Sequence, residues 1–128
     1  MKLYLLAALL LTITLLMNSC GLSNSPENTA NQFMKYLEQE NYEAAKRIST
    51  ETTGKLVDII QAAQSLSLGN KNQPKKKTPI FECDCEQENE KATCQCCQEE
   101  DQENCIKLDV FRVEGQWLVD MNKENVPH

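Results

Sequence analysis

The chain has 128 residues, seven cysteines and a formal net charge of −6. This length suits one domain with a modest core. The acidic excess lies in residues 78–128, which carry 13 acidic and 4 basic side chains, against 6 and 8 in residues 20–77. This acidity argues against nucleic acid as a partner, because phosphates are bound by Lys and Arg.

The N-terminus has the pattern of a secretory signal peptide over residues 1–19. Lys2 precedes an apolar stretch of 15 residues, 3–17, and the small Ser19 follows. A helix over this stretch would reach only ~23 Å at 1.5 Å per residue, whereas the hydrocarbon core of a bilayer is about 30 Å thick. A charged start, a short apolar stretch and a small residue are typical of an export signal. A buried N-terminal helix and a single-span anchor are the alternatives.

Residues 17–20, "MNSC", resemble the lipobox of bacterial lipoproteins. The resemblance implies that the Cys20 thiol receives a diacylglyceryl group and that the signal is cut just before it. Residues 20–25 would then be a tether to the membrane, held by acyl chains that each bury many CH₂ groups. Gly21 stands where an Asp commonly retains lipoproteins at the inner membrane, which implies the outer membrane in a cell that has one. An ordinary cysteine near a cleavage site is the alternative.

The first helix of the domain is predicted to start at Ser25. Ser25 is a good N-cap, Pro26 fits the first turn, and Glu27 suits the positive end of the helix dipole. An apolar stripe then recurs at i, i+3, i+4 and i+7, as on the buried face of an amphipathic helix. Its members are Ala30, Phe33, Met34 and Leu37.

Two further helices are expected before residue 70. Asn41 can cap a short one, and Thr50 can cap a longer one that ends at Gly69 and Asn70. The short helix would turn Tyr42, Ala45 and Ile48 inward. The longer one would bury the stripe Leu56, Ile59, Ile60, Ala63 and Leu66 or Leu68. A polar loop with three lysines, residues 75–77, follows, and such a run is usually solvated.

From residue 78 the apolar period changes from helical to alternating. Strands are expected over residues 80–86, 92–97, 106–113 and 116–121. A two-residue turn at Glu114 and Gly115 would place Val110 opposite Val119. One face of the sheet then carries Ile106, Leu108, Val110, Trp117, Val119 and Met121. Helices followed by an antiparallel sheet of about four strands make an α+β fold.

The helical stretch "PENTANQFMKYLEQENYEAAKRIS" and the closing "FRVEGQWLVDM" resemble the nuclear transport factor two-like domain, a cystatin-like cone. The likeness is strongest to small bacterial lipoproteins that carry such a domain of unknown function. It implies a single domain over residues 26–128, in which a curved sheet wraps a helix and leaves a cone-shaped pocket. These lipoproteins have no agreed activity, so the resemblance implies fold and location more than chemistry.

Six cysteines remain besides Cys20, and an exported chain meets an oxidising compartment in many bacteria. If Asn89 and Glu90 form a two-residue turn, one strand register sets two cysteines of the first strand opposite two of the second. Two cysteines are then left on the opposite face, where the loop of residues 98–104 can join them. The predicted bridges are Cys83–Cys96, Cys85–Cys94 and Cys97–Cys105.

Metal binding and free or redox-active thiols are the alternatives for this cluster. Cys-x-Cys and Cys-x-Cys-Cys supply soft ligands for zinc or copper(I), although zinc motifs usually place two residues between paired cysteines. Cys94 and Cys97 have the Cys-x-x-Cys spacing of redox enzymes, but on a predicted strand rather than at a helix start. We expect no metal and no cofactor.

No set of residues predicts catalysis. Acidic and aromatic side chains that a pocket could use lack a partner at a telling spacing, namely Tyr36, Tyr42, Asp58, Asp109 and Asp120. The single histidine is His128, the last residue, and there is no Gly-rich phosphate loop. We expect a non-enzymatic lipoprotein of the cell envelope that binds a small ligand or an envelope protein. A thiol- or metal-handling lipoprotein and a pocket enzyme of the cone fold are the alternatives.

Overall fold

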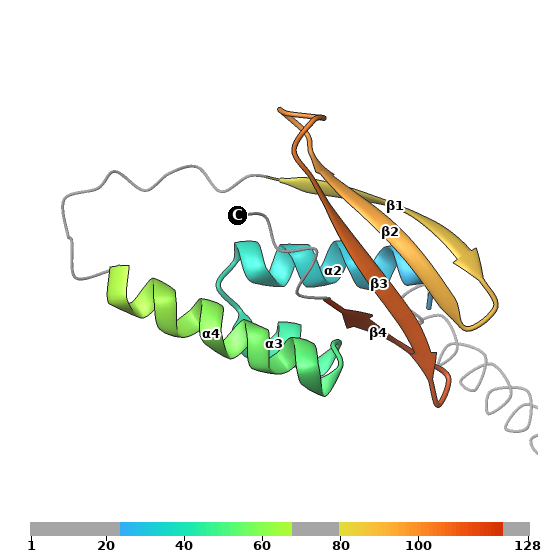
Figure 1. Cartoon of the computed structure of the whole chain (residues 1–128), viewed down its shortest axis with the longest axis horizontal. Helices are drawn as coiled ribbons and strands as arrows, with labels where there is room; N and C mark the ends of the chain where they lie inside the picture. Colours follow the sequence, from blue (N-terminus) through green and yellow to red (C-terminus); the bar gives the residue numbers. More distant parts are fainter. Residues whose placement is uncertain (1–23, 68–79, 122–128) are drawn as a thin grey trace, which may run out of the picture.

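The computed structural model describes residues 24–67 and 80–121. In this part of the chain three helices come first, α2 (Pro26–Glu38), α3 (Tyr42–Arg47) and α4 (Glu51–Ser67). Four strands follow, β1 (Phe81–Glu88), β2 (Lys91–Gln98), β3 (Cys105–Val113) and β4 (Gln116–Asp120). They form one antiparallel sheet in the order β1-β2-β3-β4 (Figure 1). The predicted α+β architecture is confirmed.

Helix α2 lies across one face of the sheet and contacts all four strands (Figure 1). The Ser25 hydroxyl caps it by accepting a hydrogen bond of 3.1 Å from the Asn28 amide, and Pro26 fills the first turn. Ala30 and Phe33 are fully buried against the sheet. The predicted stripe of this helix is therefore confirmed, with Leu37 half-buried at its end.

Both hairpin registers follow the sequence prediction. Cys83 lies opposite Cys96 across β1 and β2, and Val110 lies opposite Val119 across β3 and β4. Glu114 and Gly115 have φ values of 51° and 78°. Two successive residues with positive φ form the type I′ turn that suits the twist of a hairpin.

The core of the described residues lies between α2 and the inner face of the sheet. The alternation of β3 and β4 places apolar side chains on this face, as predicted, because successive strand residues point to opposite sides. The buried sheet residues are Cys83, Ala92, Cys94, Cys96, Leu108, Val110, Trp117 and Val119, with Met121 just after β4. The predicted Ile106 packs at the edge of this core and is half-buried.

The predicted buried stripe of α4 is wrong at three positions and holds in part at Leu56 and Ile60. Ile59 is 64% exposed and Leu66 is 85% exposed, and Ala63 is exposed as well. The buried residues of the helix are Thr53 and Val57, while Leu56 and Ile60 are half-buried. The inward face is thus rotated by about one residue, or ~100°, from the expected one.

Two contacts explain this rotation of α4. The Thr53 hydroxyl is buried and accepts a hydrogen bond of 2.7 Å from the Met121 amide, so it faces the end of β4. Further along the helix, the Tyr42 hydroxyl of α3 donates a hydrogen bond to Gln64 Oε1. Thr53 therefore belongs to the inward face beside Val57, where a search for apolar periodicity does not find it.

The segment between α3 and α4 covers the outer edge of β4. The Thr50 amide donates to the Val119 carbonyl, and the Val119 amide donates to the Ile48 carbonyl, each at 2.9 Å. The Thr50 hydroxyl donates to the Asp120 carboxylate at 2.5 Å. Because the β4 edge is paired in this way, α4 starts from a fixed point on the sheet.

Candidate functional site

Two cysteine pairs link β1 to β2 on the face that α2 covers. Cys83 pairs with Cys96 and Cys85 pairs with Cys94 at disulfide distance, with Cα separations of 3.9 and 4.0 Å. Cys83, Cys94 and Cys96 are buried, and Cys85 is half-buried. These pairs therefore belong to the core of the domain.

The third pair, Cys97 and Cys105, links β2 to β3 on the opposite face of the sheet. Its Cα atoms are 4.0 Å apart, and the two residues are separated by 8 positions in the sequence. Both residues are half-buried, and the chain that connects them, residues 99–104, is exposed. This pair is the only one of the three with neither residue in the core cluster of the described chain.

All three pairs occupy the same kind of position in the sheet. The Cys83 amide donates to Asn31 Oδ1 at 3.0 Å, on the side away from β2, so Cys83 and Cys96 form a non-hydrogen-bonded pair. In the other hairpin, the Gln98 amide bonds the Asn104 carbonyl at 3.2 Å, one position from Cys97. In antiparallel sheets, side chains at non-hydrogen-bonded positions approach each other most closely. The register thus favours a bridge at each cysteine pair.

The loop between Cys97 and Cys105 is strongly acidic. Residues 99–104 contain four acids and no base, namely Glu99, Glu100, Asp101 and Glu103. The Asp101 carboxylate accepts a hydrogen bond of 3.2 Å from the Glu103 amide and so shapes the loop. A molecule that approaches this pair meets a negative potential that salt can screen.

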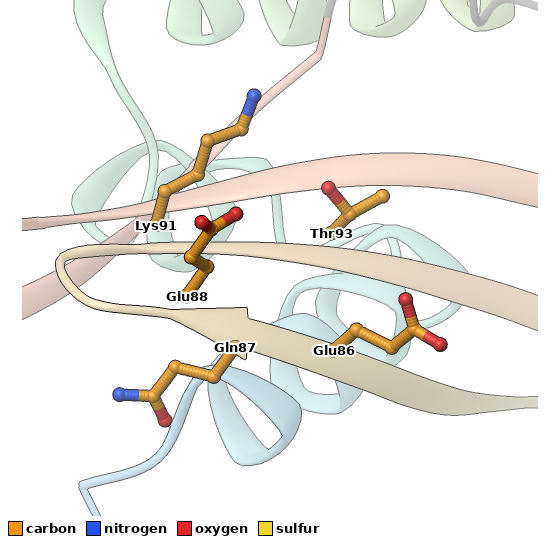
Figure 2. A pocket seen from close by; sticks show the side chains of 5 residues that line it. All are labelled: Glu86, Gln87, Glu88, Lys91 and Thr93. Carbon is orange, nitrogen blue, oxygen red and sulfur yellow. The ribbon is translucent and has the colours of Figure 1, made fainter.

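An open groove of about 430 Å³ lies over the tip of the β1–β2 hairpin (Figure 2). Glu88, Lys91 and Thr93 point to one side of the hairpin and Gln87 to the other, as the alternation of a strand requires. The Lys91 ammonium lies 3.7 Å from the Asp109 carboxylate and 5.4 Å from the centre of the Phe111 ring. The cation is thus already engaged within the sheet.

A second groove, of about 380 Å³, lies between α2 and the β3–β4 turn. Its lining carries amides, a hydroxyl and apolar groups but no charged side chain, from Asn24, Asn28, Thr29, Gln32, Ile48, Gly115, Gln116 and Trp117. The side-chain amide of Asn24 donates a hydrogen bond of 3.0 Å to the Gly115 carbonyl, which joins two sides of the groove. This groove suits an uncharged polar group.

The structure gives separate partners to the candidate catalytic acids. Asp109 and Asp120 lie opposite each other on β3 and β4, as predicted. However, Asp109 bonds the Thr93 hydroxyl at 3.3 Å, whereas Asp120 accepts from Thr50. Asp58 forms an exposed ion pair of 2.9 Å with Lys46. Among the described residues, these three carboxylates therefore act in structural contacts.

The two candidate tyrosines also lie apart from a shared pocket. Tyr36 is half-buried beside the core cluster, and neither groove described above includes it. Tyr42 is buried, and burial first, then the nearby Glu40 carboxylate, raises the pKa of its phenol above the ordinary value. A raised pKa keeps this hydroxyl protonated as the donor to Gln64.

No group of three or more His, Cys, Asp or Glu side chains within residues 24–67 and 80–121 is arranged to hold a metal ion. Among the helices of the same residues, none is long and apolar enough to cross a membrane. The predicted signal peptide, Cys20, the Lys75–Lys77 run and His128 lie outside the described residues.

Sequence reasoning did not identify three polar residues that position these sites. Asn31 satisfies the Cys83 amide, Thr53 joins α4 to Met121, and Asn24 joins the start of the fold to Gly115. Each of these bonds spans more than 50 residues of sequence. Only the three-dimensional arrangement brings the partners together, so no local pattern could have indicated them.

Comparison of the chain with known protein families, with curated proteins and with solved structures finds no match. The resemblance to the nuclear transport factor two-like cone therefore stays a prediction.

Proposed function

We propose that this chain is a lipid-anchored lipoprotein of the cell envelope whose folded domain binds a partner without catalysis. The observation that carries the proposal is where the fold begins. Asn24 is bonded to the β3–β4 turn and Ser25 caps α2, so the folded domain starts four residues after Cys20. A lipid on Cys20 would hold such a domain directly at the membrane surface.

The proposed domain type is the nuclear transport factor two-like cone. Its support is the order of elements, in which helices precede an antiparallel sheet, together with a helix lying across the sheet (Figure 1). The groove beside Trp117 is the proposed place for a small uncharged polar ligand. The separate structural partners of Asp109 and Asp120 support a domain that binds rather than catalyses.

We also propose that the three cysteine pairs form bridges in the exported protein. Bridges are common in exported domains, where a modest core gains from cross-links. They would join β1, β2 and β3 into one stapled unit at positions where opposed side chains approach closely.

The anchor is tested by extracting the protein from membranes and comparing it with Cys20→Ala. We expect the wild type to carry a diacylglyceryl group on an N-terminal Cys20 and to partition into a detergent phase. The variant should lack the lipid. A wild-type protein recovered without lipid on Cys20 would contradict the proposal, whatever the state of the other cysteines.

The Cys97–Cys105 pair supports a second candidate function, thiol–disulfide exchange. It lies on the face of the sheet opposite α2, whereas the other two pairs belong to the core cluster beneath that helix. A thiolate of a small thiol or of a dithiol protein would attack one sulfur, form a mixed disulfide and release the other sulfur as a thiolate. A second thiolate of the reductant would then restore its own disulfide and leave two reduced cysteines.

This second candidate is tested by following the reduction of each pair with mass spectrometry of alkylated peptides. We expect Cys97 and Cys105 to be alkylated well before Cys83 and Cys96, in protein that stays folded. A positively charged thiol should react faster than a negatively charged one at low salt, because the adjoining loop is acidic. Simultaneous appearance of all six thiols would contradict an exchange role for this pair.

A further inference from the structure

The sheet has two ends that differ in composition. The turn end comprises the β1–β2 turn at Asn89 and Glu90 and the β3–β4 turn at Glu114 and Gly115. The loop end comprises residues 99–104, which join β2 to β3. In an antiparallel meander the β1–β2 and β3–β4 turns lie at one end of the sheet and the β2–β3 loop at the other, because β1 and β3 run in the same direction (Figure 1).

The chain enters the domain at the turn end. The Asn24 side chain donates to the Gly115 carbonyl at 3.0 Å, and Ser25 caps the neighbouring end of α2. That end of α2 lies toward the end of the sheet that carries the two hairpin turns (Figure 1). Only residues 21–23 separate Cys20 from Asn24. Four residue steps reach at most about 14 Å, so Cys20 must lie close to the turn end.

The loop end lies much further from Cys20. Strand β3 has 9 residues and connects the loop end to the turn end. At about 3.3 Å per residue this strand is ~30 Å long, roughly twice the reach of the short connection from Cys20. The tether length therefore decides which end of the domain can reach a surface that holds Cys20.

Charge favours the same orientation. The loop end carries four acids within residues 99–104 and no base, and anionic head groups would repel it. The turn end is less acidic, because Lys91 and Arg112 lie there beside Glu88, Glu90 and Glu114. The Arg112 guanidinium lies 5.9 Å from the centre of the Trp117 ring. The groove beside Gly115 also lies here, and no acid among its lining residues would repel anionic head groups.

We infer that the turn end of the sheet lies against the lipid surface and that the loop end, with Cys97 and Cys105, faces away from it. This inference rests on the proposed lipid anchor at Cys20. It assigns the membrane-facing surface to the β3–β4 turn, the start of α2 and the tip of the β1–β2 hairpin. It assigns the acidic loop end to soluble partners.

Two exposed glutamines, one at each end, allow a matched test. Gln116 lies beside the β3–β4 turn and Gln102 lies in the acidic loop, and both are exposed. Each is replaced in turn by a photoactivatable benzophenone amino acid in the full lipidated protein. The protein is placed in vesicles of phosphatidylcholine and phosphatidylglycerol and irradiated. We expect lipid adducts at position 116 several times more often than at position 102.

The control lengthens the tether. A Gly/Ser insertion of about 20 residues between Ser23 and Asn24 has a reach of about 25 Å and should largely remove the preference for position 116. An unchanged preference in this variant would contradict the role of the short tether. Equal or more frequent adducts at position 102 in the lipidated wild-type background would overturn the orientation alone. Absence of lipid on Cys20 in the same sample would instead contradict the anchor, and the inference with it.

Discussion

Removal of the proposed Cys97–Cys105 bridge would measure how much one disulfide contributes to the free energy of unfolding. The two cysteines are half-buried on the outer face, so Ser at both positions leaves little packing to lose. Their sequence separation is 8 residues. For a loop of that length, the chain-entropy relation gives a destabilisation of about 2.5 kcal/mol. The double variant Cys97→Ser and Cys105→Ser should therefore unfold more readily while keeping its fold.

Urea unfolding followed by circular dichroism measures this effect. With an m value of about 1–1.5 kcal/mol/M, the midpoint should fall by about 2 M relative to the oxidised wild type. The matched control is the double variant Cys83→Ser and Cys96→Ser. It also places hydroxyls in the core, so it should lower the free energy of unfolding by more than the outer-pair variant does. A midpoint of the outer-pair variant within ~0.5 M of the wild type, with the inner pairs intact, would refute the bridge or its entropic role.

Three further predictions concern the helical layer and its charges. Thr53→Val should lower the free energy of unfolding by about 1–3 kcal/mol in urea, because the Met121 amide loses its buried acceptor, whereas Thr52→Val on the exposed face should change it little. Because burial raises the pKa of Tyr42, stability should fall as pH rises above 10.0, and Tyr42→Phe should remove that part of the alkaline loss in pH-dependent melting. Lys55 lowers the pKa of Glu51 below 4.5, so this ion pair stabilises the fold above that pH and the stabilisation is lost as the pH falls through the lowered pKa. Glu51→Gln should therefore reduce the loss of stability in acid, as measured by pH-dependent melting.

The strands and their register were predictable because alternation fixes them strictly. A shift of one residue would move every apolar side chain of β3 and β4 to the wrong face. The cysteines added an independent constraint, since one register of β1 and β2 sets Cys83 opposite Cys96 and Cys85 opposite Cys94. Local periodicity and the tight turns were thus sufficient to place the three pairs.

The inward face of α4 was not predictable in the same way. Apolar residues lie on more than one side of this helix, and the apolar stripe that looked most continuous is exposed at Ile59 and Leu66. The face is set instead by the hydrogen bond that the Met121 amide donates to the Thr53 hydroxyl and by the one that the Tyr42 hydroxyl donates to Gln64. Propensity and apolar periodicity do not detect polar groups that are buried because distant partners satisfy them.

The grooves were also beyond the reach of sequence reasoning. The groove beside Trp117 is lined by residues from the start of α2, the end of α3 and the β3–β4 turn. These segments are far apart in the sequence and carry no motif. Only the three-dimensional arrangement, in which Asn24 bonds the Gly115 carbonyl, brings them together at one end of the sheet.

The lipid anchor and the three bridges are tested most directly by the intact mass of the native protein from membranes, measured before and after reduction and alkylation. We predict an N-terminal Cys20 with a diacylglyceryl group and six cysteines that become alkylated only after reduction. A mass that includes residues 1–19, or six thiols that are alkylated without a reductant, would contradict this prediction.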